Sequence, residues 1–112
     1  MAQYPMRVAY VEDNVPHELI DVAAMINYNA YSNKELDDKC ELLYNVVKDK
    51  LARRVTPRKT FNKTAMRQVP AHVPDKLIAV FNKFDFPELN KFERVTYKMA
   101  LEVWVRANLK IR

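Results

Sequence analysis

Residues 32–51 read SNKELDDKCELLYNVVKDKL, and this stretch decides the fold class. Ser32 and Glu35 have the spacing of a capping box, in which the serine hydroxyl accepts a hydrogen bond from the third helical amide and the glutamate reaches back to the cap amide. Apolar residues then recur at spacings of 4, 3, 4 and 4, which is the helical period: Leu36, Cys40, Leu43, Val47 and Leu51. The stretch therefore predicts a helix that begins at residue 33 and buries one face over about five turns.

A second helical signal follows Asn90, which stands three residues before Glu93 in another capping-box arrangement. Apolar residues cover two sides of this segment: Phe92, Val95, Met99 and Val103 on one side, and Tyr97, Leu101, Trp104 and Val105 on the other. A helix that is apolar around so much of its circumference is typical of a central position or of an oligomer interface. Residues 103–111 also alternate between apolar and polar, as a strand does, so we predict helix to residue 102 at least and leave the rest open.

Weaker patterns supply the remaining elements. Residues 6–11 predict a short strand, and residues 103–111 are its candidate partner. Three further helices are predicted: from a cap at Asp13 or Asn14 to about Tyr31, from Pro57 to about Gln68, and from Asp75 to about Phe84. The predicted fold is mainly α, a compact bundle of four to five helices, with a short two-stranded β edge formed by the termini if residues 103–111 are a strand.

The absence of glycine restricts the chemistry, since average usage would give about eight glycines in 112 residues. Phosphate-binding loops, dinucleotide-binding turns and nucleophile elbows need glycine for positive φ or for close backbone approach. Tight two-residue hairpins also favour glycine, which agrees with a helical chain. The sequence therefore indicates a protein that is not an enzyme, and we expect no cofactor.

Metal and thiol chemistry are not indicated either. His17 and His72 are the only histidines, and neither has a second histidine or a cysteine at ligand spacing. Cys40 is the only cysteine and lies on the apolar stripe of residues 36–51, where a buried thiol acts as a small hydrophobe. We therefore expect no metal site and no catalytic residue.

Length and composition favour one domain, residues 1–112, in which 49% hydrophobic residues can form a single core. A single cysteine excludes an intramolecular disulfide, and the N-terminus lacks the charged and apolar regions of a signal peptide. No run of about 18 apolar residues is present, so no membrane association is predicted. The expected location is intracellular, in the cytoplasm or the nucleus.

Positive charge is concentrated in residues 48–67, where eight cations and one acid give +7, against +5 for the whole chain. Clustered Lys and Arg displace counterions from a phosphate backbone, and an amide on the same helix can reach a base edge. The first functional hypothesis is therefore a small DNA- or RNA-binding protein with a basic helix-turn-helix-like segment. Its candidate contact residues are Arg53, Arg54, Arg58, Lys59, Asn62, Lys63 and Arg67.

The alternative hypothesis is a protein-interaction module, such as an inhibitor, an adaptor or a small viral or regulatory accessory factor. Aromatic and arginine side chains dominate the energetics of protein interfaces. Four aromatic residues are expected to be exposed and to contact a larger partner: Tyr28, Tyr31, Phe86 and Trp104. The expected partner is thus a nucleic acid or an acidic protein surface, with a homo-oligomer as a further alternative.

Overall fold

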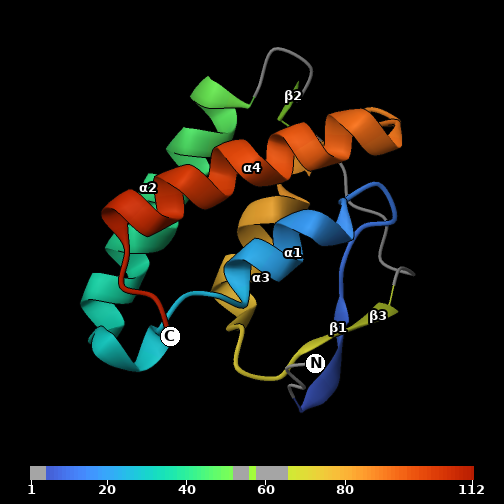
Figure 1. The fold of residues 1–112 in the computed structure, drawn as a ribbon. Coiled ribbons are helices and arrows are strands. Elements are labelled where there is room, and N and C mark those ends of the chain that lie inside the picture. Colours follow the sequence, from blue (N-terminus) through green and yellow to red (C-terminus); the bar gives the residue numbers. More distant parts are fainter. Residues whose placement is uncertain (1–4, 52–55, 58–65) are drawn as a thin grey trace.

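The computed structural model describes residues 5–51, 56–57 and 66–112. Four α-helices lie within these residues: α1 His17–Ala23, α2 Asn33–Lys50, α3 Asp75–Asn82 and α4 Lys91–Asn108. Four short strands accompany them: β1 Met6–Tyr10, β2 Thr56–Pro57, β3 Met66–Pro70 and β4 Phe84–Asp85. Helix α4 packs on α1, and α2 packs on α3, around one hydrophobic core (Figure 1). The prediction of a mainly α-helical bundle is therefore confirmed.

Helix α2 forms as predicted, from its cap to its buried face. The amide of Glu35 donates to Oγ of Ser32 at 3.2 Å, and the amide of Ser32 donates to Oε1 of Glu35 at 3.0 Å. The stripe faces the core, since Cys40, Leu43 and Val47 are all buried. Burial raises the pKa of the Cys40 thiol, as expected for a cysteine that fills core space.

Helix α4 begins at the second predicted capping box. The amide of Glu93 donates to Oδ1 of Asn90 at 2.8 Å, and the amide of Asn90 donates to Oε1 of Glu93 at 3.2 Å. The helix continues through Asn108, so the strand alternative is wrong for residues 103–108. Helix extension is cooperative once a first turn is capped, which explains why the alternating pattern did not prevail. Beyond the helix, Ile111 forms an isolated antiparallel bridge with Ile26.

The first predicted helix is wrong at both ends. The residue at its N-terminal cap is Pro16, and not Asp13 or Asn14. Helix α1 ends at Ala23, and residues Tyr28–Ala30 form a separate 3-10 turn. Between these two elements, the amide of Asn27 donates to the carbonyl of Lys110 at 2.8 Å. The end of the chain therefore takes backbone groups that a continuous helix would have used, and tertiary contacts override the local helical pattern.

The N-terminal strand forms as β1, but its partner is β3 and not the C-terminus. The two strands are antiparallel, with Val8 opposite Gln68. The predicted helix 57–68 is therefore wrong at Pro57, which lies in β2, and where it overlaps β3. Its residues 58–65 lie outside the described part of the chain. Pro70 disfavours helical geometry at Val69, and the extended form places the Val69 side chain in the core at 1% exposure.

Helix α3 ends at Asn82, two residues before the predicted end, and the chain then enters β4, which pairs with β2. The Asn82 side chain is buried and bridges two backbone groups near the end of β1. Its Nδ2 donates to the carbonyl of Tyr10 at 3.0 Å, and its Oδ1 accepts from the amide of Glu12 at 3.0 Å. These bonds fix the loop after β1 against the end of α3.

Candidate functional site

The predicted nucleic-acid segment can be described only at its two ends. Six of its seven predicted contact residues lie outside the described residues: Arg53, Arg54, Arg58, Lys59, Asn62 and Lys63. At its start, Lys48 and Lys50 are exposed in the last turn of α2. Cations in this position offset the negative end of the helix dipole, so these two lysines already have a structural role.

Arg67, the seventh predicted contact residue, does not lie on an exposed helix. It stands in β3, and its Nη2 donates to the carbonyls of Glu12 and Val15 at 2.8 and 2.7 Å. Burial lowers the pKa of its guanidinium. Arg67 therefore holds the loop after β1 against the sheet. It was predicted to lie on a helix, and that part of the prediction is wrong, because Arg67 lies in β3.

Phe86 was expected on the surface, but it is 2% exposed, so this prediction is wrong. Its ring lies 6.2 Å from the ring of Phe84, which stacks on Tyr44 at 4.9 Å between centroids. Nδ2 of Asn14 donates to the Phe86 carbonyl at 2.9 Å. The chain after β4 is thus held inward, although Pro87 and nearby polar residues make the segment look like an exposed loop.

The other three predicted interface aromatics are half-buried, and two of them serve the fold. The hydroxyl of Tyr28 donates to the carbonyl of Ala23, and burial raises the pKa of Tyr28 well above its ordinary value. The hydroxyl of Tyr31 accepts from the amide of Lys110 at 2.8 Å. Trp104 lies half-buried on α4. The four predicted residues therefore do not form one exposed aromatic surface.

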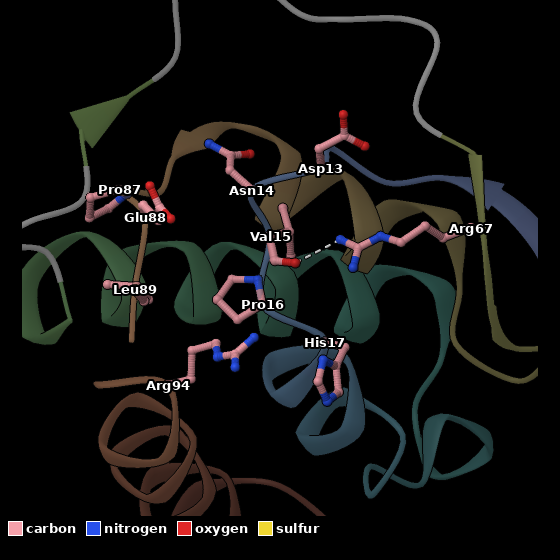
Figure 2. Close-up of a pocket in the computed structure, with 10 residues that line it drawn as sticks. All are labelled: Asp13, Asn14, Val15, Pro16, His17, Arg67, Pro87, Glu88, Leu89 and Arg94. Atoms are coloured by element: carbon pink, nitrogen blue, oxygen red, sulfur yellow. Dashed lines mark hydrogen bonds between the residues drawn. The ribbon is translucent and has the colours of Figure 1, made fainter. Parts of the chain in front are cut away.

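A cavity of about 370 Å³ opens between the loop after β1 and the loop before α4 (Figure 2). The first loop contributes Asp13, the start of α1 contributes His17, and the second loop contributes Glu88. Arg67 enters from β3 and Arg94 from α4. Figure 2 shows the guanidinium of Arg67 directed at the backbone of the first loop, where it donates to the Val15 carbonyl. The lining therefore mixes charges of both signs.

The described charges that line this cavity are of both signs, and its two arginines are engaged by neighbouring groups. Nε of Arg94 lies 3.7 Å from Oε2 of Glu18, and Arg67 is bound to backbone carbonyls. The Nε atoms of both arginines are buried without a hydrogen-bond partner among the described residues. Among the described residues, no group of three His, Cys, Asp or Glu side chains is placed to hold a metal ion.

The outer face of α4 carries an apolar stripe that the core does not use. Phe92 is 85% exposed, Val95 41%, Met99 62% and Val103 68%. Their spacings of 3, 4 and 4 residues place them on one side of the helix. Leu101 on the opposite side is fully buried. We call these four exposed residues the α4 stripe.

The α4 stripe is hollowed near the start of the helix. Phe92, Val95, Thr96 and Met99 line a depression of about 300 Å³ together with Lys91. The first four stand at positions i, i+3, i+4 and i+7. In coiled coils, four residues with this spacing form the hole that receives one side chain from a facing helix.

The stripe residues were recognised in the sequence as one side of a helix, but no site was assigned to them. The sequence signal for this surface was the second apolar side of residues 90–108, because a helix needs only one apolar side to pack on a core. The exposed fraction of each side was not available from the sequence. The predicted contact site was the basic segment of residues 48–67, whereas the exposed apolar surface lies on α4.

No helix in the described part of the chain is long and apolar enough to cross a membrane. Among the described residues, the α4 stripe contains the three most exposed large apolar side chains, although Met6, Val8 and Met66 in β1 and β3 are exposed too. Positive charge is concentrated in residues 48–67. Comparison with known proteins adds no relative, because no family model, no curated protein and no solved structure matches this chain.

Proposed function

We propose that this chain is a non-enzymatic protein-interaction module that binds an α-helix along the α4 stripe. The observation that carries the proposal is the exposure of four apolar side chains at helical spacing, on a helix whose other side already forms the core. Single exposed apolar residues are normal on protein surfaces and need no explanation. A contiguous row of them is instead a feature of interaction sites.

The alignment of the four side chains along α4 supports helix binding more strongly than the area of the stripe does. The four side chains expose roughly 400 Å² of apolar surface, which is within the range of the largest patches on monomeric proteins. Phe92 and Val103 mark the two ends of the stripe and lie about 16 Å apart along the helix axis. Val95 and Met99 fill the distance between them. A helix laid along α4 contacts all four side chains at once.

The chemistry of the stripe favours a helix over a strand or a nucleic acid. The main-chain groups of α4 are used within the helix, so α4 offers no edge to which a strand can be added. Thr96 and Ala100, which border the stripe, carry no charge for a phosphate. The nearby Arg106 is paired with Glu102 at 3.3 Å. Apolar side chains from a facing helix are the groups that fit this surface.

The expected affinity is modest. Complete burial of a Phe, Met or Val side chain stabilises by about 1.5–3 kcal/mol. The stripe therefore supplies several kcal/mol, most of which offsets the loss of translational and rotational freedom on association. A dissociation constant in the micromolar range follows, and Phe92, as the largest and most exposed side chain, is expected to contribute most.

A library of peptides displayed in a helical scaffold tests the proposal without knowledge of the natural partner. Selection uses the wild-type chain at sub-micromolar concentration, and the binders are then measured on two variants. Met99→Glu places a charge in the middle of the stripe and is expected to weaken binding at least about tenfold. Leu42→Glu changes an exposed leucine of α2 and should leave binding unchanged. A selection without binders, or binders that tolerate Met99→Glu, would contradict the proposal.

A second candidate function, nucleic-acid binding, is favoured by the charge of residues 48–67, where eight cations stand against one acid. Fluorescence anisotropy of labelled duplex DNA and single-stranded RNA at about 50 and about 200 mM salt tests it. The variant Arg58→Ala/Lys59→Ala/Lys63→Ala should weaken binding and reduce its dependence on salt. The charge-matched variant Lys34→Ala/Lys83→Ala/Lys110→Ala should bind like the wild type. If the folded protein binds neither nucleic acid at low salt, this candidate is excluded.

A further inference from the structure

We propose that the helix covering the α4 stripe is α4 of a second copy of this chain, laid antiparallel in a symmetric dimer. This inference rests on the proposed function, because it names the occupant of the same surface. Three properties of α4 support it: the spacing of the stripe residues, the charges beside the stripe and the exposed area. Each of them is a property that a self-complementary surface must have.

The stripe fits a second copy of itself in a single antiparallel register. Phe92 and Met99 stand seven residues apart, and the two holes beside them are also seven residues apart. Residues 92–99 form the first hole, and Met99, Glu102, Val103 and Arg106 form the second. When Met99 of the second copy enters the first hole, Phe92 of the second copy reaches the second hole. The two-fold axis repeats both insertions, so one register seats four side chains.

The charges on α4 favour the antiparallel over the parallel arrangement. An antiparallel pair places the positive start of each helix dipole beside the negative end of the other. In the register above, Lys91 of one copy lies at the level of Glu102 of the second copy, on the same flank of the interface. A parallel pair would instead separate Lys91 from Glu102 of the second copy and bring Arg106 against Arg106, and like charges in contact oppose association.

The exposed area is sufficient for a weak but specific dimer. Thr96 and Ala100 are small and exposed beside the stripe, so two helix axes can approach to about 8–10 Å. Such a dimer removes the stripe and its flanks from solvent on both copies, on the order of 1,200 Å² in total, which is the lower limit of specific interfaces. We therefore expect reversible dimerisation with a dissociation constant on the order of 10 µM.

Sedimentation equilibrium of the full chain tests the inference. The mean mass of the wild type should rise from 13.2 kDa towards twice that value as the concentration increases from about 1 to about 500 µM. Met99→Glu should remain at 13.2 kDa throughout, whereas Leu42→Glu should dimerise like the wild type. Met99 is 62% exposed, so its substitution leaves the core intact, and thermal melting of the variant checks that it folds.

Cysteine cross-linking tests the orientation in a Cys40→Ala background. In the proposed register, Thr96→Cys lies about 4 Å along the axis from the same position in the second copy, so a short bismaleimide should join the two. Lys91→Cys lies about 19 Å along the axis from its counterpart and should not be joined. In a parallel dimer both cysteine pairs would lie at the same axial level, so Lys91→Cys would be linked as well as Thr96→Cys.

The outcomes separate this inference from the proposed function. A wild type that stays monomeric at the highest concentration overturns the dimer, and so does a dimer that Met99→Glu leaves intact. Efficient linkage of Lys91→Cys overturns the antiparallel arrangement, whether or not Thr96→Cys is also linked. If the wild type is monomeric but selected helical peptides bind it and depend on Met99, only the second-copy inference fails. The stripe then binds a helix of a different protein.

Discussion

Helices α2 and α4 have the same length and begin in the same way, yet the apolar stripe of α2 faces the core and that of α4 faces solvent. Each spans 18 residues and begins at a capping box. In α2 the stripe is buried, with Leu43 1% exposed. In α4 the stripe is on the outside, with Phe92 85% exposed. The same sequence periodicity therefore leads to core packing in one helix and to an uncovered surface in the other.

The composition of the opposite side explains the difference. The side of α2 away from the core carries Asp38, Glu41 and Asn45, all exposed, so only one face of that helix can be buried. Helix α4 instead has a second apolar set, and Leu101 and Val105 occupy the core. An apolar stripe thus shows which face of a helix can be buried. Whether that face packs into the core of the same chain depends on the residues on the opposite face of the helix.

Truncation of side chains gives the largest expected contrast between the two stripes. Leu43→Ala in α2 and Leu101→Ala in α4 remove fully buried side chains and should each lower the free energy of unfolding by about 2–5 kcal/mol. Met99→Ala should change it by less than about 0.5 kcal/mol, because the side chain is exposed. Urea unfolding at about 1 µM protein, where the proposed dimer is dissociated, measures all three. A loss for Met99→Ala as large as that for Leu101→Ala would show that the stripe is covered within the monomer.

Thiol reactivity compares the stripes without changing the core. Cys40 is 7% exposed in α2, and burial raises the pKa of its thiol, so it reacts only after local opening. Met99→Cys in a Cys40→Ala background places a thiol on the outer stripe instead. An aromatic disulfide reagent should modify the Met99→Cys thiol at least about 100-fold faster than Cys40 at the same pH. Equal rates would mean that α2 opens readily or that the α4 stripe is protected.

The sequence was sufficient for α2 and α4 because their determinants are local. Ser32 with Glu35, and Asn90 with Glu93, form hydrogen bonds within one helical turn, and these pairs are visible as a spacing of three residues. The apolar period then extends each helix over several turns. Both helices were therefore predicted at their first residue.

The errors arose where distant segments meet. The end of α1 depends on Asn27 bonding to Lys110, and β1 depends on a partner about sixty residues away. Pro70 is the local signal against a helix at the end of β3, but the pairing of this strand with β1 could not be read from the local sequence. Arg67 was misassigned for the same reason, because its acceptors Glu12 and Val15 lie in another part of the sequence.

The residues of the α4 stripe could be predicted from the sequence, but their exposure could not. The sequence identified Phe92, Val95, Met99 and Val103 as one side of a helix that is apolar on two sides. Which side enters the core is a property of the whole fold, because Leu101 and Val105 compete with the stripe for contact with α1. Sequence periodicity limits the site to two faces, and only the packing of α4 on α1 selects between them.

Removal of the helix caps should lower the free energy of unfolding equally for α2 and α4. Equal losses would show that the two helices differ in tertiary packing and not in their capping. Ser32→Ala and Asn90→Ala each leave helical amides without a side-chain acceptor and should lower the free energy of unfolding by about 1 kcal/mol. Ser32→Asp and Asn90→Asp retain an acceptor and serve as matched controls. Thermal and urea unfolding measure the four variants. An effect at one cap alone would indicate that the two helices already differ locally.

The capping box of α2 should also produce a small pH dependence of stability. Hydrogen bonds from the amide and hydroxyl of Ser32 lower the pKa of Glu35, so the folded state binds this proton less readily than the unfolded state does. A lowered pKa in the folded state stabilises above the ordinary glutamate range, and this contribution is lost as the pH falls below about 4. Glu35→Gln keeps an acceptor for the Ser32 amide but does not titrate. The wild type should therefore exceed Glu35→Gln in stability at neutral pH and approach it near pH 3, whereas Glu41→Gln, further along α2, should follow the wild type. A stability difference between wild type and Glu35→Gln that is independent of pH would assign the capping energy to hydrogen bonding alone, without a contribution from the carboxylate charge.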